Sequence, residues 1–200
     1  MKDIKTNGIL FSFTTDPMLP ETRDLTMDAV GYALSKGVPV QILTKDADWL
    51  SDFQRRCINN PIFGLSKDKI AFGFTLTGCD DLEPHASPNQ ERIEAMRKLH
   101  SQGFKTFASI EPVVEPQKSI EMIEASKDCC DIFKVGLMSG KKDYKLLELK
   151  ALFKYLSGLT SCKIYLKGNL VKYLGIDRNS LPIHFIRTDY NMFNKYGKLL

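Results

Sequence analysis

The sequence is short of the features that mark membrane, secreted and metal-finger proteins. Its 200 residues contain no apolar run of the roughly 18 residues that a membrane helix needs, and residues 1–5 (MKDIK) lack the apolar segment of a secretory signal. There are only five cysteines, an odd number, and none has CxxC, CxxxCxxC or Cys/His finger spacing. We therefore expect no membrane partner, no disulfide scaffold, and reduced thiols in the cytoplasm.

Common catalytic and nucleotide-binding signatures are also missing. The sequence has neither GxGxxG nor GxxxxGK[ST], so it lacks the glycine-rich loops that cradle phosphates. His85, His100 and His184 have no metal-ligand spacing, and we interpret them as surface or core residues. No Ser-His-Asp arrangement emerges from the spacing either.

Charge is modest but unevenly distributed. The formal net charge is +4, too small by itself to indicate a nucleic-acid partner. Residues 141–200 nevertheless carry 12 Lys/Arg against 4 Asp/Glu, whereas residues 1–140 are net acidic. The basic C-terminal region favours contact with nucleic acid only weakly, because a solvated lysine-rich helix face has the same composition.

What the sequence does contain is one repeated unit. Hydrophobic residues make up 43% of the chain, and short β-branched or aromatic runs recur about every 30 residues, the length of a strand plus a helix. Helical patterns occupy 21–36, 89–102, 117–127 and 143–156 between these runs. The predicted strands are Ile9–Asp16, Val38–Lys45, Ile70–Thr77, Phe104–Glu111, Asp131–Met138 and Lys163–Lys167.

Strand-helix alternation at this period predicts an α/β fold with parallel strands and right-handed crossovers. Since a closed eight-unit barrel usually needs about 250 residues, we expect a partial (β/α) barrel of about six units over 1–175, or an open doubly wound sheet. Residues 176–200 are predicted to form an irregular segment packed on this body. For the helix over 21–36, the spacing predicts a face formed by Leu25, Ala29, Tyr32 and Ala33.

Each predicted strand turns polar on one face near its carboxyl end, where α/β proteins bind ligands. The charged members are Asp16, Lys45, Glu111, Lys134 and Lys167. Because an unpaired buried charge is costly, these groups must pair with one another or meet a ligand. Their mixed signs favour a zwitterionic ligand, and an internal salt-bridge layer without a ligand is the alternative.

The order of short motifs resembles the radical S-adenosylmethionine superfamily, in particular its spore-photoproduct-lyase or DNA-repair-photolyase branch. The resemblance covers roughly residues 8–140 and corresponds to that family's barrel from its second strand onward. The motifs that carry it are Thr14-Thr15-Asp16-Pro17, Leu43-Thr44-Lys45, Phe74-Thr75-Leu76-Thr77, Leu82-Glu83-Pro84, Arg92, Ser109-Ile110-Glu111-Pro112-Val113 and Phe133-Lys134-Val135-Gly136.

The resemblance implies that S-adenosylmethionine binds across the carboxyl ends of the strands. By this likeness, Thr14, Thr15 and Asp16 meet the methionine amino group, while Lys45 and Thr77 lie near the carboxylate or ribose. Ser109 and Glu111 border the ribose and adenine. Thr75 and Lys134 complete the expected cofactor-binding set.

One departure from the family is large, because the chain has no CxxxCxxC loop for a [4Fe–4S] cluster. The family's first βα unit is apparently missing, so the chain is expected to be inactive in radical chemistry, as a fragment or as a cluster-free relative. A non-catalytic module that binds S-adenosylmethionine, a nucleotide or a protein is the alternative, with self-association or partner binding at an open sheet edge. A metal-free enzyme that uses Lys45 and Glu111 as acid and base is a third reading.

Overall fold

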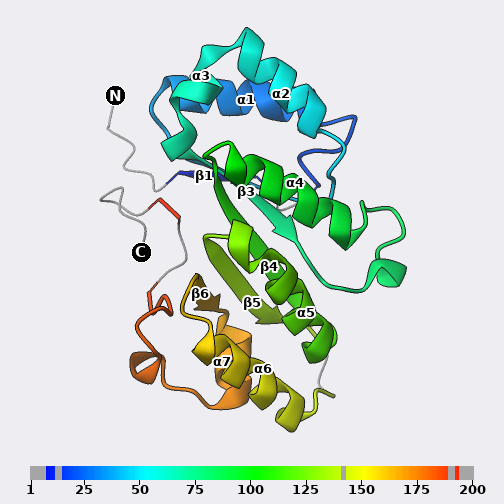
Figure 1. The fold of residues 1–200 in the computed structure, drawn as a ribbon, viewed down its shortest axis with the longest axis vertical. Coiled ribbons are helices and arrows are strands. Elements are labelled where there is room, and N and C mark those ends of the chain that lie inside the picture. Colours follow the sequence, from blue (N-terminus) through cyan, green and yellow to red (C-terminus); the bar gives the residue numbers. More distant parts are fainter. Residues whose placement is uncertain (1–7, 12–14, 141–142, 189–191, 194–200) are drawn as a thin grey trace.

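The computed structural model describes residues 8–11, 15–140, 143–188 and 192–193. Six parallel strands form one sheet in the order β1-β2-β3-β4-β5-β6, so neighbours in sequence are neighbours in space (Figure 1). The α/β fold with parallel strands is confirmed, and the order contains no reversal point of the doubly wound kind. The strands are β1 Ile9–Phe11, β2 Val40–Thr44, β3 Ile70–Thr75, β4 Lys105–Val113, β5 Ile132–Leu137 and β6 Lys163–Leu166.

The helices alternate with these strands. Because every crossover joins adjacent parallel strands in the same direction, the connecting helices fall on one face of the sheet, which Figure 1 shows for α4 and α5. None of the helices in the described residues has the length and apolar content to cross a membrane. The helices are α1 Arg23–Ser35, α2 Leu50–Asn59, α3 Pro61–Leu65, α4 Asn89–Ser101, α5 Pro116–Ser126, α6 Leu146–Gly158 and α7 Gly168–Leu174.

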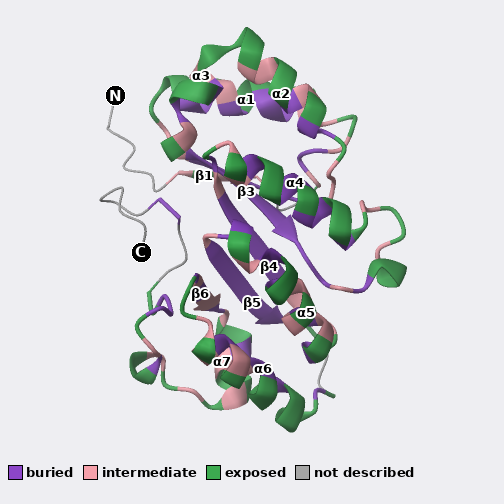
Figure 2. Ribbon diagram, viewed as in Figure 1, coloured by how far each residue is buried: buried purple, intermediate pink, exposed green. Residues whose placement is uncertain are grey.

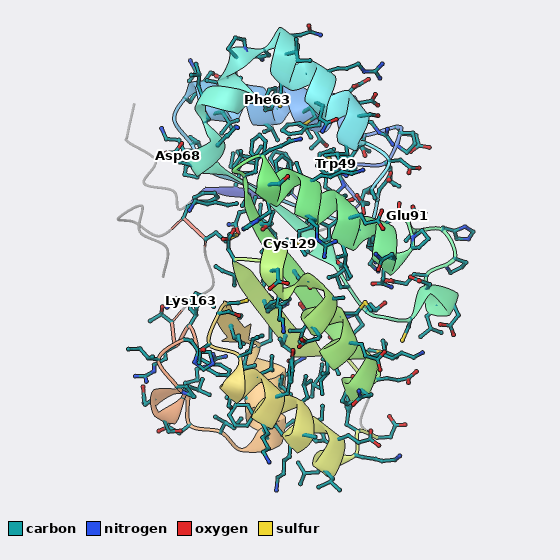
Figure 3. The ribbon with its side chains drawn as sticks, in the orientation of Figure 1. Trp49, Phe63, Asp68, Glu91, Cys129 and Lys163 are labelled. Atoms are coloured by element: carbon teal, nitrogen blue, oxygen red, sulfur yellow. The ribbon has the colours of Figure 1, made fainter. Side chains whose placement is uncertain are left out.

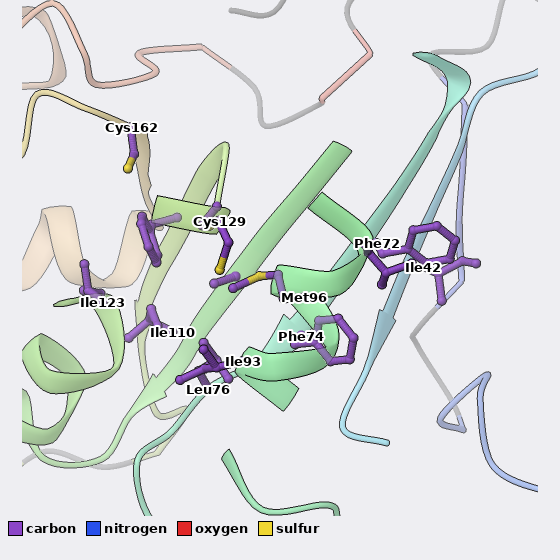
Figure 4. Close-up of a cluster of buried hydrophobic side chains, with 14 of the residues drawn as sticks. Ile42, Phe72, Phe74, Leu76, Ile93, Met96, Ile110, Ile123, Cys129 and Cys162 are labelled. Atoms are coloured by element: carbon purple, nitrogen blue, oxygen red, sulfur yellow. The ribbon is translucent and has the colours of Figure 1, made fainter. Parts of the chain in front are cut away.

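The main core lies between the sheet and these helices, and β2 to β5 are buried along most of their length (Figure 2). Trp49 precedes α2 and is 1% exposed; its ring contacts those of Phe53, Phe72 and Phe74. Figure 4 shows the centre of this core, with Met96 of α4 directed at the sheet. Trp49 therefore joins α2 to the core.

Of the four residues expected to form one face of α1, Ala33 is buried, and the other three, Leu25, Ala29 and Tyr32, are exposed, so that face is not the buried one. Leu25 and Tyr32 are 77% and 69% exposed, whereas Met27, Val30 and Leu34 face the sheet. Both sets of residues recur at helical spacing, and the direction of packing against β2 decides which set is buried.

The C-terminal segment extends the sheet and also packs on its inner face, which is the face opposite the helices. Phe185 forms a parallel bridge with Ile164 at the outer edge of β6. Beyond it, Ile186, Met192 and Phe193 pack in a second cluster with residues of β3, β4 and β5 on the face opposite the helices. The strand members of this cluster are Ala71, Phe107 and Ile132.

Candidate functional site

Strand register brings the predicted polar residues into lateral rows. Thr75 pairs with Ser109, Ser109 with Lys134, and Lys134 with Tyr165 across β3 to β6. Lys45 follows Thr44, whose partner Phe74 precedes Thr75, so Lys45 continues this row beside β3. The prediction that strand ends converge on one polar edge is consistent with this register.

Both carboxylate oxygens of Asp16 accept hydrogen bonds from other residues of the protein. Its Oδ1 accepts hydrogen bonds from Thr44 Oγ1 at 2.6 Å and Met18 N at 3.0 Å, and its Oδ2 accepts one from Lys45 N at 2.7 Å. The carboxylate therefore ties the segment after β1 to the end of β2. Thr15 is exposed beside it, and Thr14 lies outside the described residues.

Glu83 is the centre of the charged network over β2 and β3. Its Oε1 lies 2.6 Å from Lys45 Nζ, and its Oε2 accepts hydrogen bonds from Arg92 Nη1 at 3.0 Å and Thr77 Oγ1 at 2.9 Å. Burial alone would raise the pKa of Glu83, but Lys45, Arg92 and Thr77 outweigh it and hold that pKa below its ordinary value. Glu83, whose side chain is 9% exposed, is therefore ionised because of these partners and in spite of its burial.

Arg92 anchors the loop that carries Glu83. Its side chain is fully buried, its Nε donates to Ser87 O at 2.6 Å, and its Nη1 donates to Thr75 O at 2.8 Å. The guanidinium thus ties the end of β3 to the segment that precedes α4.

A cavity of about 790 Å³ opens beside this network, at the carboxyl ends of β1, β2 and β3. It lies at the end of α4 that carries Glu91, labelled in Figure 3. Five carboxylates line it against one lysine and one histidine. The charged lining residues are Asp16, Asp46, Asp48, Glu83, Glu91, Lys45 and His85. Arg23 and Arg92 pair with two of these acids, Asp46 and Glu83, and the acids still in excess suit a ligand that carries more positive than negative charge.

The ends of β4 to β6 form a second polar group. Glu111 Oε2 pairs with Lys167 Nζ, and Gly136 lies beneath this pair: a Cβ built on it would stand 3.1 Å from Lys167 Cβ and 3.2 Å from Glu111 Oε1. The Nζ of Lys134, a residue that is 6% exposed, lies 5.6 Å from the centroid of the Phe107 ring. An irregularity in β4 sets two residues, Glu111 and Pro112, against one residue of β5.

The predicted site is therefore divided. Asp16 and Lys45 line the cavity, and Thr77 contacts it through Glu83. Ser109, Glu111 and Lys134 lie farther along the row, over β4 and β5, with Thr75 between the two groups.

Glu83 and Arg92 were not among the expected site residues. Arg92 does carry a signal, because it shares a helix stripe with the buried Met96 and Leu99, where a charge needs a partner. Glu83 is a loop residue, and no periodicity indicates that it meets Lys45.

The cysteines do not fit a [4Fe–4S] cluster at this edge. Cys129, Cys130 and Cys162 precede β5 and β6 and so lie at the amino ends of the strands, while Cys57 and Cys79 stand alone in the sequence. All five thiols are free, and burial raises the pKa of each, which disfavours the thiolate that binds iron. No group of three potential metal ligands occurs among the residues that the structure describes.

Comparison with known proteins gives one viral relative and no family. No protein-family model matches the sequence. The chain is similar to an uncharacterized protein, ORF301, of Acidianus two-tailed virus, with 28% identity over 122 residues. The match covers 58% of this chain and 38% of the viral protein, so the chain spans well under half of that relative. Its function must therefore be argued from the site.

Proposed function

We propose that this chain binds S-adenosylmethionine in the cavity over β1 to β3, as a partial (β/α) barrel related to radical S-adenosylmethionine enzymes. The observation that supports this most is the lining of the cavity, which carries five carboxylates and Lys45. S-adenosylmethionine carries an ammonium and a sulfonium against one carboxylate. Its charge pattern is complementary to that lining, and the volume lies in the usual range for small-molecule sites.

The proposed roles follow from what each group already contacts. Both oxygens of Asp16 accept hydrogen bonds within the chain, so this residue positions the backbone of Lys45. The exposed Asp48 and Glu91 face the cationic groups of the ligand, and Lys45, whose side chain is 43% exposed, takes its carboxylate. Thr15, Thr75, Thr77 and Ser109 remain proposed contacts for the rest of the ligand. Glu111 and Lys134 lie over β4 and β5 and do not line this cavity.

Radical chemistry needs cluster ligands that these 200 residues do not supply. The proposal for the chain is therefore cofactor binding, with any cluster thiolates contributed from elsewhere. The acid-base alternative is less favoured because Lys45 pairs with Glu83, while Glu111 pairs with Lys167 on the other side of the row. A cytoplasmic location fits five free thiols.

Calorimetric titration tests the proposal. We expect saturable binding of S-adenosylmethionine that Lys45→Ala abolishes. Asp48→Asn and Glu91→Gln should each weaken binding about threefold to tenfold, since each removes one charge from the cavity rim. S-adenosylhomocysteine, which lacks the sulfonium charge, should bind more weakly than S-adenosylmethionine.

Asp81→Asn is the matched control, because Asp81 is an exposed acid in the loop that carries Glu83 and does not line the cavity. This variant should bind like wild type. Absence of binding, or equal loss in all the acid variants including the control, would contradict the proposal.

A non-catalytic interaction module is the second candidate. It is favoured by β1, which is only three residues long and forms one edge of the described sheet. An edge strand presents backbone N–H and C=O groups with which another chain can pair, and a strand of three residues offers few of them. This reading predicts association with or without bound S-adenosylmethionine.

A further inference from the structure

The inner face of the sheet carries a basic cluster that the proposed S-adenosylmethionine site does not use. Its members are Lys134 of β5, Lys167 after β6 and Arg178 of the short helix η4, Arg178–Ser180. Among the described residues, Glu111 pairs with Lys167. Three basic side chains and the carboxylate of Glu111 are thus the charged groups that the described part of the chain places at the carboxyl ends of β4 to β6.

Two neighbouring strands hold these groups in a compact array. Lys134 is the register partner of Tyr165. Gly136 lies two residues farther along β5, and Lys167 lies two residues beyond Tyr165, just after β6. Tyr165 packs against the inner cluster that contains Phe107 and Ile132, which shows that these side chains lie on the face opposite the helices. The absent side chain at Gly136 leaves the space in which Glu111 and Lys167 meet.

Arg178, in the C-terminal segment, is the third member of the basic cluster. Its guanidinium lies 5.3 Å from the centroid of the Tyr165 ring, and its Nη2 donates to Leu166 O at 2.7 Å, beside Lys167. Its Nη1 is buried and has no hydrogen-bond partner in the described residues. A buried guanidinium N–H without an acceptor is costly, and a bound anion would satisfy it.

We propose that Lys134, Lys167 and Arg178 form a binding subsite for the phosphate group of a ligand. A guanidinium stacked on a tyrosine presents its N–H groups in the planar fork that matches phosphate oxygens. Two lysines beside it supply the remaining charge. The subsite goes beyond the proposed binding of S-adenosylmethionine and is independent of it, since the acid-lined cavity lies over β1 to β3.

Titration with inorganic pyrophosphate tests the subsite, and a fluorescent single-stranded octathymidylate tests whether the phosphate belongs to a nucleic acid. We expect pyrophosphate to bind wild type, and Arg178→Gln and Lys167→Gln each to weaken it about tenfold or more, as one charged hydrogen-bond partner is lost. Octathymidylate that competes with pyrophosphate identifies a nucleic-acid source. If octathymidylate does not compete with pyrophosphate, the phosphate group belongs to a free phosphorylated compound and not to a nucleic acid.

Lys172→Gln provides the matched control, because Lys172 is an exposed lysine on α7 and makes the same change in net charge. It should bind pyrophosphate within about twofold of wild type. Glu111→Gln should strengthen binding severalfold, because it frees Lys167 from its carboxylate partner. That gain keeps the test decisive if Arg178→Gln fails to fold.

The proposal is overturned if wild type does not bind pyrophosphate, or if Lys172→Gln weakens binding as much as Lys167→Gln. It is also overturned if Glu111→Gln lowers the melting temperature without any gain in affinity. None of these outcomes depends on whether S-adenosylmethionine binds, so the two proposals fail separately.

Discussion

At the scale of single residues, Arg92 is a fully buried charge whose stability depends on its hydrogen-bond partners. It is fully buried, and its partners are Glu83 and the carbonyls of Thr75 and Ser87. Arg92→Ala removes the donor of two carbonyls and leaves the nearly buried Glu83 carboxylate with Lys45 and Thr77 as its remaining partners. We expect it to lower the free energy of unfolding by about 3–5 kcal/mol.

Urea denaturation followed by circular dichroism measures this loss. Arg97→Ala is the control on the same helix, because Arg97 is exposed and, among the described residues, donates to Ala125 O alone, at 3.1 Å. Its cost should stay below about 1 kcal/mol. Equal losses in the two variants would mean that the buried network contributes nothing specific.

The lowered pKa of Glu83 predicts how stability depends on pH. In the unfolded chain this carboxyl titrates near its ordinary value of about 4.3, whereas in the folded protein its pKa is lower. The stabilisation by its ion pairs is therefore complete above the ordinary pKa and is lost as the pH falls through the folded value. Between about pH 6 and pH 3, wild type should lose more free energy of unfolding than Glu83→Gln. Parallel curves for the two proteins would refute this assignment.

At the residue level, the sequence predicts that the charges at the strand ends pair with one another or meet a ligand. Glu111 and Lys167, both in that set, do pair, whereas Lys45 pairs with Glu83, a loop residue outside it. Only the register and the loop path bring these atoms together, and neither follows from the order of residues.

At the scale of elements, β3 and β4 approach closely at a glycine. A Cβ built on Gly73 would lie 2.2 Å from the ring of Phe107, which is itself fully buried. Gly73→Ala must displace that ring within a packed interior, and we expect a loss of about 1–3 kcal/mol.

Thermal unfolding of matched glycine variants measures this effect. Gly64→Ala, in α3, meets no atom within 4 Å and should leave stability unchanged or raise it by a few tenths of a kcal/mol. If Gly73→Ala unfolds at the wild-type temperature, the ring contact is not a constraint.

The two leucines of α1 separate the buried face from the exposed one. Leu34 is 3% exposed and Leu25 is 77% exposed, although both fit a helical stripe in the sequence. Leu34→Ala should cost about 2–5 kcal/mol, and Leu25→Ala less than about 0.5 kcal/mol. Chemical denaturation of both variants decides between the structure and the face expected from spacing.

The positions of the strands and of α1, α4, α5 and α6 were readable from sequence, whereas α2, α3 and α7 were not among the expected helices. All six predicted strands overlap observed strands, because β-branched and aromatic runs are bounded by glycine and proline. The face of α1 could not be read, since Leu25 and Tyr32 have the same spacing as Met27 and Leu34. Packing against a sheet chooses between two such stripes, and the choice is a tertiary effect.

At the scale of the whole molecule, the carboxyl edge is divided by charge. Acidic residues surround the cavity over β1 to β3, and basic residues gather at the ends of β4 to β6. The sequence showed its own asymmetry between residues 1–140 and 141–200. It did not reveal that the two signs would occupy opposite halves of one edge, because that depends on strand order.

The edge at β1 predicts association between molecules. We expect the weight-average mass measured by light scattering to rise with protein concentration. Ile9→Lys should suppress this rise, because Ile9 is 40% exposed on that strand and a charge on an edge strand disfavours pairing. A mass that stays at the monomer value over all concentrations would contradict edge pairing.

The packing of Met192 and Phe193 on Ala71, Phe107 and Ile132 has a consequence for biosynthesis. The strand-helix units join neighbours in the chain, so they are able to assemble in order as the polypeptide emerges from the ribosome. The inner surface of β3 to β5 has to wait for residues more distant in the sequence, which makes its closure a late and slow event. Until then Phe107 and Ile132 face water, and a nascent chain at that stage is a natural client for chaperones.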